Sequence, residues 1–234
     1  MEAASNSGEA ATAGGRRRGL VAVGDSITNG EGQPMLGVRC QSWALWLASA
    51  LELPYTGLAV NGAVAAQARD EQVPRLRGPY DVGCVYLGVN DVRNPGFELD
   101  PFVDALADVL DAVGRAAERV LVATVPLDLG RPAAPRERIE GCDAAIERLA
   151  LERGAAVVDL RGVRGWTLVL PDAVHLTALG QLRVAELAAR ALGSGRDPAD
   201  LADPHRSVRA HVRYALTTHA AAVGRDGRRR FAER

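Results

Sequence analysis

The sequence predicts an α/β protein built on a mainly parallel β-sheet. Two observations support this fold class. Short apolar runs alternate along residues 20–192 with longer segments of helical periodicity, and such alternation is typical of parallel strands joined by right-handed helical crossovers. The apolar runs are also almost uninterrupted, which is expected of strands that helices cover on both faces.

Five strands are expected, each a short apolar run between polar or glycine-containing segments. They occupy residues 20–23, 56–60, 82–87, 120–125 and 156–160. Four helices are expected between and after them, at residues 41–52, 101–117, 135–153 and 177–192.

Two of the helices carry specific signals. In the helix at 135–153, Ile139, Cys142 and Ile146 recur at spacings of three and four, which gives it one apolar face. Asp100 directly precedes Pro101, so we expect Asp100 to cap the helix at 101–117 with proline at its first position.

Length and composition limit the possible functions. With 234 residues and 47% hydrophobic side chains, the chain is expected to form one globular domain with appendages. A formal charge of −1 argues against a nucleic-acid partner, and no apolar stretch approaches the roughly 20 residues that cross a bilayer. Residues 1–18 are interpreted as a disordered leader, because the apolar run after their arginines, residues 20–23, is too short for a secretory signal; we expect a cytoplasmic protein.

The cysteines indicate neither disulfides nor a metal site. Cys40, Cys84 and Cys142 are odd in number and far apart, which is typical of reduced, buried thiols. No pair of cysteines or histidines has the spacing of metal ligands, so no metal is expected.

The last part of the chain differs in charge from the rest. Residues 196–234 hold nine arginines and five acids, a net charge of +4, whereas residues 1–195 hold 19 arginines and 24 acids, a net charge of −5. We expect an α/β body at 19–193 and a basic helical extension at 194–234. The extension is interpreted as a solvated helix packed loosely on the body; the alternative is contact with an anion, a membrane surface or a partner.

Three polar segments follow three of the expected strands. Residues 24–30 read GDSITNG after the first strand, Asn61 and Gly62 follow the second, and residues 88–91 read GVND after the third. The carboxyl ends of parallel strands meet at one edge of a sheet, so these segments are expected to lie together there. Ser26 is then a hydroxyl at a strand-to-helix turn, next to the free N–H groups of a helix start.

A fourth segment supplies the groups that such a serine needs as a nucleophile. Residues 172–175 read DAVH, and His175 is the only histidine in residues 1–195. His175 can take the serine proton, and Asp172 can orient the imidazole from the same loop. The backbone N–H groups of Ser26 and Gly62 and the side-chain amide of Asn90 are the candidate oxyanion donors.

Taken in order, these four segments resemble the blocks of the SGNH hydrolase superfamily, the GDSL esterases and lipases. Thr177 and Gly180 also follow the fourth block as in the family, whereas Leu176 stands where members often have proline. The resemblance covers residues 20 to about 192. It implies a flavodoxin-like three-layer α/β/α sandwich with a five-stranded parallel sheet, and no cofactor.

The same resemblance implies the roles of the site residues. Ser26 would be the nucleophile, His175 the base and Asp172 its orienting acid, with Ser26, Gly62 and Asn90 forming the oxyanion hole. The expected activity is hydrolysis of a small-molecule carboxylic ester or thioester through an acyl-enzyme. The alternatives are an acyltransferase of the same fold and a non-catalytic binding protein.

Other side chains near these blocks have simpler interpretations. Asp25 and Asp91 are expected to bind loop amides, and Trp43 and Trp46 are expected in the core. The candidate pocket residues are Arg93, Phe97 and Trp166, although a surface ion pair is the preferred interpretation of Arg93. Substrate choice is expected to depend on the loops at 31–40, 93–100 and 126–135.

Overall fold

The computed structural model describes residues 18–204, 207–220 and 223. Its centre is a five-stranded parallel sheet in the order β3-β1-β4-β5-β6. The strands are β1 (Leu20–Gly24), β3 (Tyr55–Gly57), β4 (Tyr80–Tyr86), β5 (Ala117–Ala123) and β6 (Ala156–Val158). This arrangement confirms the predicted five-stranded, flavodoxin-like sheet.

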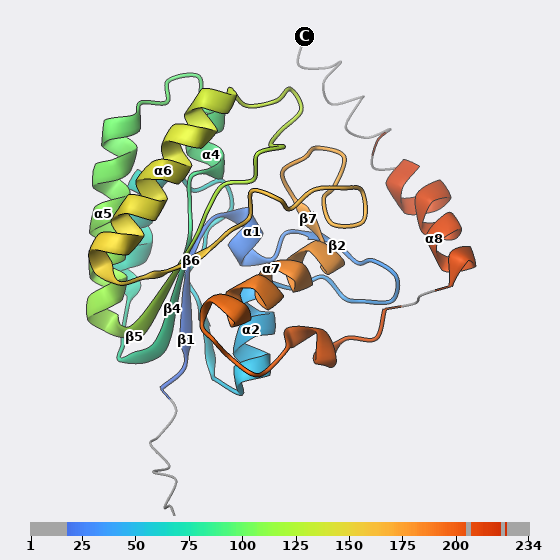
Figure 1. Ribbon diagram of the computed structural model, residues 1–234, viewed down its shortest axis with the longest axis horizontal. Helices are drawn as coiled ribbons and strands as arrows, with labels where there is room; N and C mark the ends of the chain where they lie inside the picture. The colour runs from blue at the N-terminus through green and yellow to red at the C-terminus, as the bar shows by residue number, and fades with distance from the viewer. Residues whose placement is uncertain (1–17, 205–206, 221–222, 224–234) are drawn as a thin grey trace, which may run out of the picture.

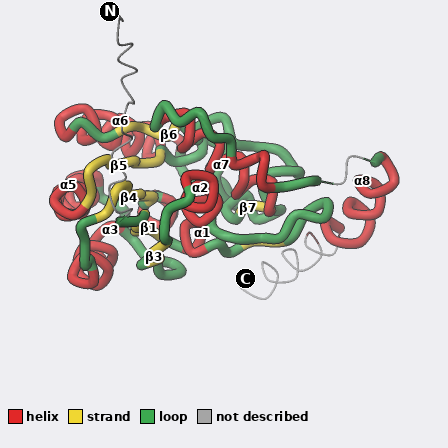
Figure 2. The backbone as a smooth tube through the Cα atoms, turned by 90° about the horizontal axis from the view of Figure 1, so that it is seen from below, coloured by secondary structure: helices red, strands yellow, loops and turns green. Residues whose placement is uncertain are grey.

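Helices cover both faces of the sheet and complete the predicted three-layer sandwich (Figure 1). The helices α5 (Leu99–Ala116) and α6 (Arg136–Arg153) lie on one face, and α2 (Trp43–Leu51) and α7 (Ala178–Ala191) lie on the other. Figure 2 shows the same layers from below. Three short helices stand in the loops: α1 (Ser26–Asn29), α3 (Ala65–Gln67) and α4 (Val89–Arg93), and π- and 3₁₀-turns at Ala68–Gln72 and Val73–Arg75 follow α3.

A second, two-stranded sheet was not expected from the sequence. It pairs β2 (Gly32–Gln33) with β7 (Leu176–Thr177) in parallel. Each strand has only two residues, too few for an alternating pattern to appear. The pairing matters because it holds the segment after α1 against the segment that begins at His175.

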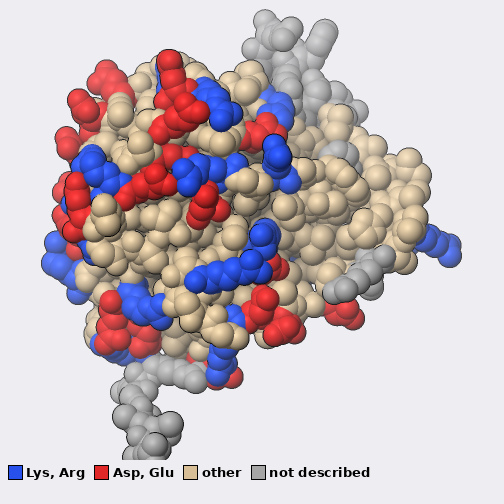
Figure 3. Space-filling model, in the orientation of Figure 1, with Lys and Arg blue, Asp and Glu red and all other residues tan. Residues whose placement is uncertain are grey.

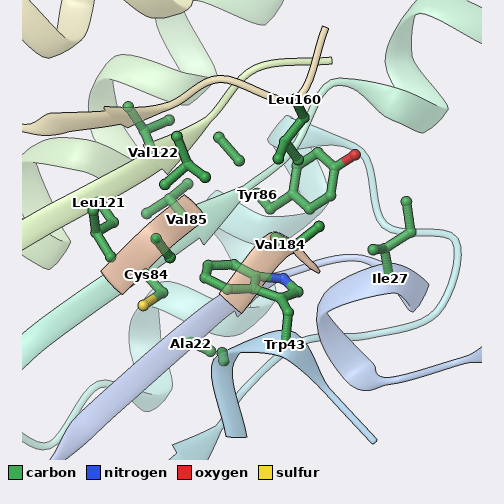
Figure 4. Packing of buried hydrophobic residues seen from close by; sticks show 14 of the residues in the cluster. Ala22, Ile27, Trp43, Cys84, Val85, Tyr86, Leu121, Val122, Leu160 and Val184 are labelled. Carbon is green, nitrogen blue, oxygen red and sulfur yellow. The ribbon is translucent and has the colours of Figure 1, made fainter. Parts of the chain in front are cut away.

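The core lies between the helices and the sheet. Figure 4 shows Trp43 and Val184 packed beside Ala22 and Cys84 of the sheet. Trp43 is completely buried and Trp46 nearly so, which confirms their predicted place in the core. The central strands β1 and β4 are buried along almost their whole length, as expected of uninterrupted apolar runs.

The expected cap of α5 is wrong. The helix begins at Leu99, and Asp100 lies inside its first turn; Glu98, at the capping position, accepts no side-chain hydrogen bond. Proline is then the third helical residue, and it is tolerated because the first-turn N–H groups have no helical partner anyway. The acidic Asp100 still interacts favourably with the positive end of the helix dipole.

The thiols agree with the sequence in part. Cys40, Cys84 and Cys142 form no disulfide; Cys84 and Cys142 are buried, whereas Cys40 is only half-buried. Within the described part of the chain, no helix is both long and apolar enough to cross a membrane, and no group of three acidic, histidine or cysteine side chains could hold a metal ion. The cytoplasmic location stays a prediction.

The two ends of the chain were predicted to be appendages. The expected leader at 1–18 lies outside the described residues except for Arg18. After α7 the chain forms a 3₁₀-turn (Pro198–Leu201), α8 (Val208–Tyr214) and a π-turn (Ala215–His219). Figures 1 and 2 both place α8 at the margin, on the far side of α7 from the sheet. The domain boundaries at 19–193 and 194–234 stay predictions.

Gln72 is a buried polar residue that the sequence did not single out. Its Oε1 accepts from the Gly24 N–H at 2.9 Å, and its Nε2 donates to the Gly24 carbonyl at 2.8 Å.

Gln72→Ala leaves a buried N–H of the first strand without a partner. We expect it to lower the free energy of unfolding by about 2–4 kcal/mol, measured by urea unfolding. The exposed Gln67→Ala is the control and should change that free energy by less than about 1 kcal/mol.

Candidate active site

Ser26 lies where the first strand of the sheet turns into a helix. It is the first residue of α1, directly after β1, and only 6% of it is exposed. Asp25 caps the helix: its Oδ1 accepts from the Ile27 N–H at 2.9 Å, which confirms its expected loop-binding role. Gly24 must be glycine, because a Cβ there would lie 2.7 Å from the carbonyl oxygen of Tyr86.

His175 is held by the loop that leads into α7. The next two residues form β7, and Thr177 then caps α7 by accepting from the Gly180 N–H at 3.1 Å. Gly180 is required here, since a Cβ would lie 2.0 Å from the Leu168 carbonyl oxygen. The Thr177 and Gly180 of the fourth block therefore fix the start of α7 behind the histidine.

The three residues predicted as a triad are in direct contact. Ser26 Oγ lies 3.0 Å from His175 Nε2, and His175 Nδ1 lies 2.7 Å from Asp172 Oδ2. A carboxylate can only accept, so Nδ1 carries the proton and Nε2 is left to accept from the serine hydroxyl. Ser26 and His175 are 149 residues apart in the chain, so only the fold brings them together.

The Asp172 carboxylate is fixed from both sides. While Oδ2 accepts from the imidazole, Oδ1 accepts from the backbone N–H groups of Val174 at 2.9 Å and His175 at 3.0 Å. Burial alone would raise the pKa of Asp172, but the hydrogen bonds from His175 and Val174 hold that pKa below its ordinary value. Asp172 therefore stays an anion that orients the ring.

The pKa of His175 is raised above its ordinary value. Burial of the ring would lower the pKa, but the hydrogen bond and charge of Asp172, and then the charges of Glu31 and Asp25, outweigh burial. Asp25 is itself fully buried, and this burial raises its pKa to about 7. Its Oδ2 has no hydrogen-bond partner among the described residues.

Sequence reasoning missed Glu31. Its Oε2 lies 3.7 Å from His175 Nε2, the nitrogen that faces Ser26 Oγ. The Glu31 backbone N–H donates to the Ser26 carbonyl at 2.9 Å, and the adjacent Gly32–Gln33 strand pairs with the segment after His175. A carboxylate in this position stabilises the imidazolium. The only feature of the sequence that pointed to Glu31 was its position directly after the GDSITNG block. Its contact with His175 depends on the β2–β7 pairing, which the sequence did not predict.

The second and third loops adjoin the first, as predicted. Asn29 Nδ2 donates to Asn61 Oδ1 at 2.8 Å, and Asn90 Nδ2 donates to the Ala63 carbonyl at 3.1 Å. Asp91 joins two loops, since it accepts from the N–H groups of Ala65 and Gly88. That confirms its expected structural role.

The candidate oxyanion donors lie in these loops. Gly62 is exposed and adopts a left-handed backbone with φ of +80°. One N–H bond of the Asn90 amide is used by Ala63, and the amide has a second. Their role in binding an oxyanion stays a prediction.

Gln181 was also missed, although it supports the loop of the nucleophile. It is fully buried on α7; its Nε2 donates to the Ile27 carbonyl at 2.9 Å, and its Oε1 accepts from the Trp43 N–H at 2.9 Å. One side chain thus ties α7 to α1 and α2. Its partners lie 154 and 138 residues away, and no local pattern reveals such contacts.

Phe97 lies at a pocket beside the third loop. Its ring packs 6.1 Å from that of Phe102, with the Arg138 guanidinium 5.9 Å from its centre. With Phe102 and Asp91 among others, it lines a surface pocket of about 130 Å³. Arg93 is exposed nearby and forms no ion pair within the described part of the chain, so the preferred ion-pair interpretation is wrong.

Trp166 faces the C-terminal extension instead. Phe97 lines two surface pockets, the one described above and another beside Leu99 and Arg138, and Trp166 lines neither of them. Its ring stacks on Tyr214 of α8 with centroids 6.0 Å apart, and 42% of the residue is exposed. A substrate-binding role for Arg93, Phe97 or Trp166 stays a prediction.

Comparison with known proteins identifies the family. The model of the GDSL-like Lipase/Acylhydrolase family matches residues 22–183, more than half of the chain, and this span includes Ser26, Asn90 and His175. The chain belongs to the GDSL-like lipase/acylhydrolase family. This acylhydrolase is therefore a serine hydrolase that acts on esters, as the sequence predicted. No curated protein matches it.

Solved structures share the fold of this acylhydrolase. An acetylxylan esterase from Geobacillus stearothermophilus, Axe2, is 18% identical with a TM-score of 0.58, covering 75% of this chain and 94% of its own. A protein named TesA is 23% identical with a TM-score of 0.61, covering 74% of this chain and 97% of its own. A lipase/acylhydrolase from Enterococcus faecalis is 18% identical with a TM-score of 0.58, covering 74% and 94%.

Proposed function

We propose that this acylhydrolase cleaves carboxylic esters or thioesters through an acyl-enzyme on Ser26, with His175 as the base and Asp172 as the orienting acid. The observation that carries the proposal is the unbroken chain of contacts from Ser26 Oγ to His175 Nε2 at 3.0 Å and from Nδ1 to Asp172 at 2.7 Å. In the related acetylxylan esterase, a serine-to-alanine variant is described as a catalytic mutant.

Acylation begins at the serine hydroxyl. As Ser26 Oγ bonds to the carbonyl carbon of the ester, its proton moves to His175 Nε2. The imidazolium that forms is stabilised by Asp172 on Nδ1 and by the Glu31 carboxylate 3.7 Å from Nε2. When the tetrahedral intermediate collapses, the bond to the leaving group breaks, and Nε2–H protonates the departing alkoxide or thiolate.

Deacylation repeats these steps with water as the nucleophile. His175 takes a proton from water, the hydroxide adds to the acyl carbon, and the proton returns to Ser26 Oγ as the acid leaves. Both tetrahedral intermediates carry an oxyanion. The Ser26 N–H, the Gly62 N–H and the Asn90 amide are the donors proposed for it.

Covalent labelling tests the acyl-enzyme. A fluorophosphonate probe should add one phosphonyl group to the peptide that contains Ser26, detected by mass spectrometry, and an excess of ester substrate should slow the labelling.

A graded panel of acyl esters and thioesters, assayed with and without alcohol acceptors, should yield free acid as the main product. Main transfer to the alcohol would instead establish an acyltransferase.

Asn90→Ala tests the proposed oxyanion hole. We expect kcat to fall by about 10²–10³-fold with little change in KM, because an oxyanion-hole donor acts mainly in the transition state. The variant also removes the hydrogen bond to Ala63, so its thermal unfolding must be measured beside its kinetics. The exposed Gln67→Ala, which removes a side-chain amide on α3, is the control, and a loss of equal size there would contradict the role of Asn90.

Glu31→Gln tests how the site sets its pH dependence. His175 must be neutral to accept a proton, so a raised pKa of His175 moves the acid limb of kcat/KM to higher pH. Removing the Glu31 charge should shift that limb to lower pH on a neutral ester. Glu152→Gln, at the opposite edge of the sheet, should leave the limb in place. An unmoved limb in Glu31→Gln contradicts the electrostatic role.

A further inference from the structure

The C-terminal helical segment exposes a stripe of aliphatic side chains. Val208, Val212 and Leu216 are 79%, 51% and 73% exposed, and Val223 is 49% exposed. Val208, Val212 and Leu216 recur every four residues through α8 and the π-turn that follows it, which places them on one side of the segment. Scattered apolar residues on a surface are ordinary, but three in one stripe indicate a contact surface.

The side of this segment that faces the body is a different one. Tyr214 is only 6% exposed and stacks on Trp166 with ring centroids 6.0 Å apart, and Ala210 also packs against the core. At about 100° per residue, these two residues lie opposite the stripe. The segment therefore has two apolar sides: one contacts the body, and the other, the stripe, is exposed.

The charge beside the stripe is positive. Arg209 and Arg213 follow Val208 and Val212 directly and border the stripe on one flank. From 204 to 225 the sequence contains no acidic residue, and residues 196–234 carry a net charge of +4, against −5 for residues 1–195. In Figure 3 the surface on this side, at the right, is mostly uncharged, with basic side chains at its outer margin and acidic ones at its lower border.

The exposed aliphatic stripe and the positive charge beside it together indicate which kind of partner binds here. A second copy placed by two-fold symmetry would set this cationic surface against its own image, and the like charges would repel. An anionic lipid surface instead attracts the arginines while the aliphatic stripe enters the boundary between headgroups and acyl chains. Arginine side chains can extend from such a stripe toward the headgroups. We propose that the stripe Val208, Val212 and Leu216 docks the protein on an anionic lipid surface.

The docking surface is connected to the candidate active site. Trp166, which holds α8, begins a segment that pairs with the His175 loop: the Leu170 N–H donates to the His175 carbonyl at 2.8 Å, and the Thr177 N–H donates to the Leu168 carbonyl at 2.9 Å. A lipid surface bound at α8 would therefore lie close to the segment that pairs with the His175 loop. The proposal itself does not depend on the catalytic roles.

Vesicle co-sedimentation of the full chain tests the proposal. With phosphatidylglycerol-containing vesicles at low ionic strength, we expect binding about tenfold tighter than with pure phosphatidylcholine vesicles, and weaker binding as salt rises. Arg209→Gln with Arg213→Gln should remove most of that preference. Equal binding to both kinds of vesicle, or no binding to either, overturns the proposal.

Matched variants test the stripe. Leu216→Asp and the neutral Leu216→Ser should both weaken binding several-fold, the aspartate more strongly. Leu151→Asp is the control, because Leu151 is 85% exposed on α6 and the variant adds the same charge elsewhere. Thermal unfolding should be unchanged in all three. If Leu216→Asp binds vesicles like the wild type, or if it instead dissociates a dimer that ignores vesicles, the lipid proposal is wrong.

Discussion

Ser26→Ala should lower kcat for a short-chain ester by about 10⁴-fold or more, with little change in KM. The methyl group cannot form the acyl-enzyme, so only the catalysis that an oxyanion hole and substrate binding provide should remain. Ser26 is nearly buried and its hydroxyl contacts only the imidazole among the described groups, so the loss should appear in the chemical step and not in folding. Initial rates on p-nitrophenyl acetate measure it.

Ser49→Ala is the matched control. Ser49 is exposed on α2, where its hydroxyl donates to the Leu45 carbonyl of its own helix. This variant should hydrolyse the ester and take up the fluorophosphonate like the wild type, whereas Ser26→Ala should do neither. If Ser26→Ala keeps more than about a tenth of the wild-type rate, the proposed nucleophile is wrong.

Much of the site could be predicted because parallel topology places loops in a known way. Ser26, Asn61 and Asn90 each follow a strand, and the carboxyl ends of parallel strands share one edge. No knowledge of side-chain packing was needed to place them together. The five strands of the main sheet and the four long helices were equally accessible, since the apolar patterns that reveal them are local in the sequence.

Contacts between distant residues could not be predicted in the same way. Gln72 pairs with Gly24 across 48 residues, and Gln181 reaches Ile27 across 154. A buried glutamine has no periodic signature, and its partner is a backbone group that any residue carries. Glu31 illustrates the same limit, because its contact with His175 depends on a strand pair of two residues each.

Two further features could not be predicted from the sequence: the first residue of α5 and the side of α8 that contacts the body. Aspartate before proline indicates a helix start, but here the helix gains two further residues, Leu99 and Asp100, before the proline. For the C-terminal extension, the sequence predicted a helix packed on the body but not the side of that helix that contacts the body. A single aromatic pair, Trp166 with Tyr214, decides that.

Asp172→Asn should be nearly as damaging as loss of the nucleophile, although it changes only one atom of the side chain. The oxygen that accepts from the Val174 and His175 N–H groups should stay in place, because the NH₂ group of asparagine cannot accept those two hydrogen bonds. The new NH₂ group then faces His175 Nδ1 and donates to it. Nδ1 must therefore be the acceptor, and the ring proton moves to Nε2.

That tautomer cannot perform the reaction. With its proton on Nε2, the imidazole donates to Ser26 Oγ instead of accepting from it, so the hydroxyl keeps its proton. By analogy with the same change in serine proteases, kcat should fall by about 10⁴-fold while the fold is retained. Nδ1 and Nε2 proton signals in nuclear magnetic resonance spectra would report the tautomer directly. The exposed Asp108→Asn should change neither rate nor tautomer. A loss below about tenfold in Asp172→Asn would mean that the geometry of the ring, and not its tautomer, is what Asp172 provides.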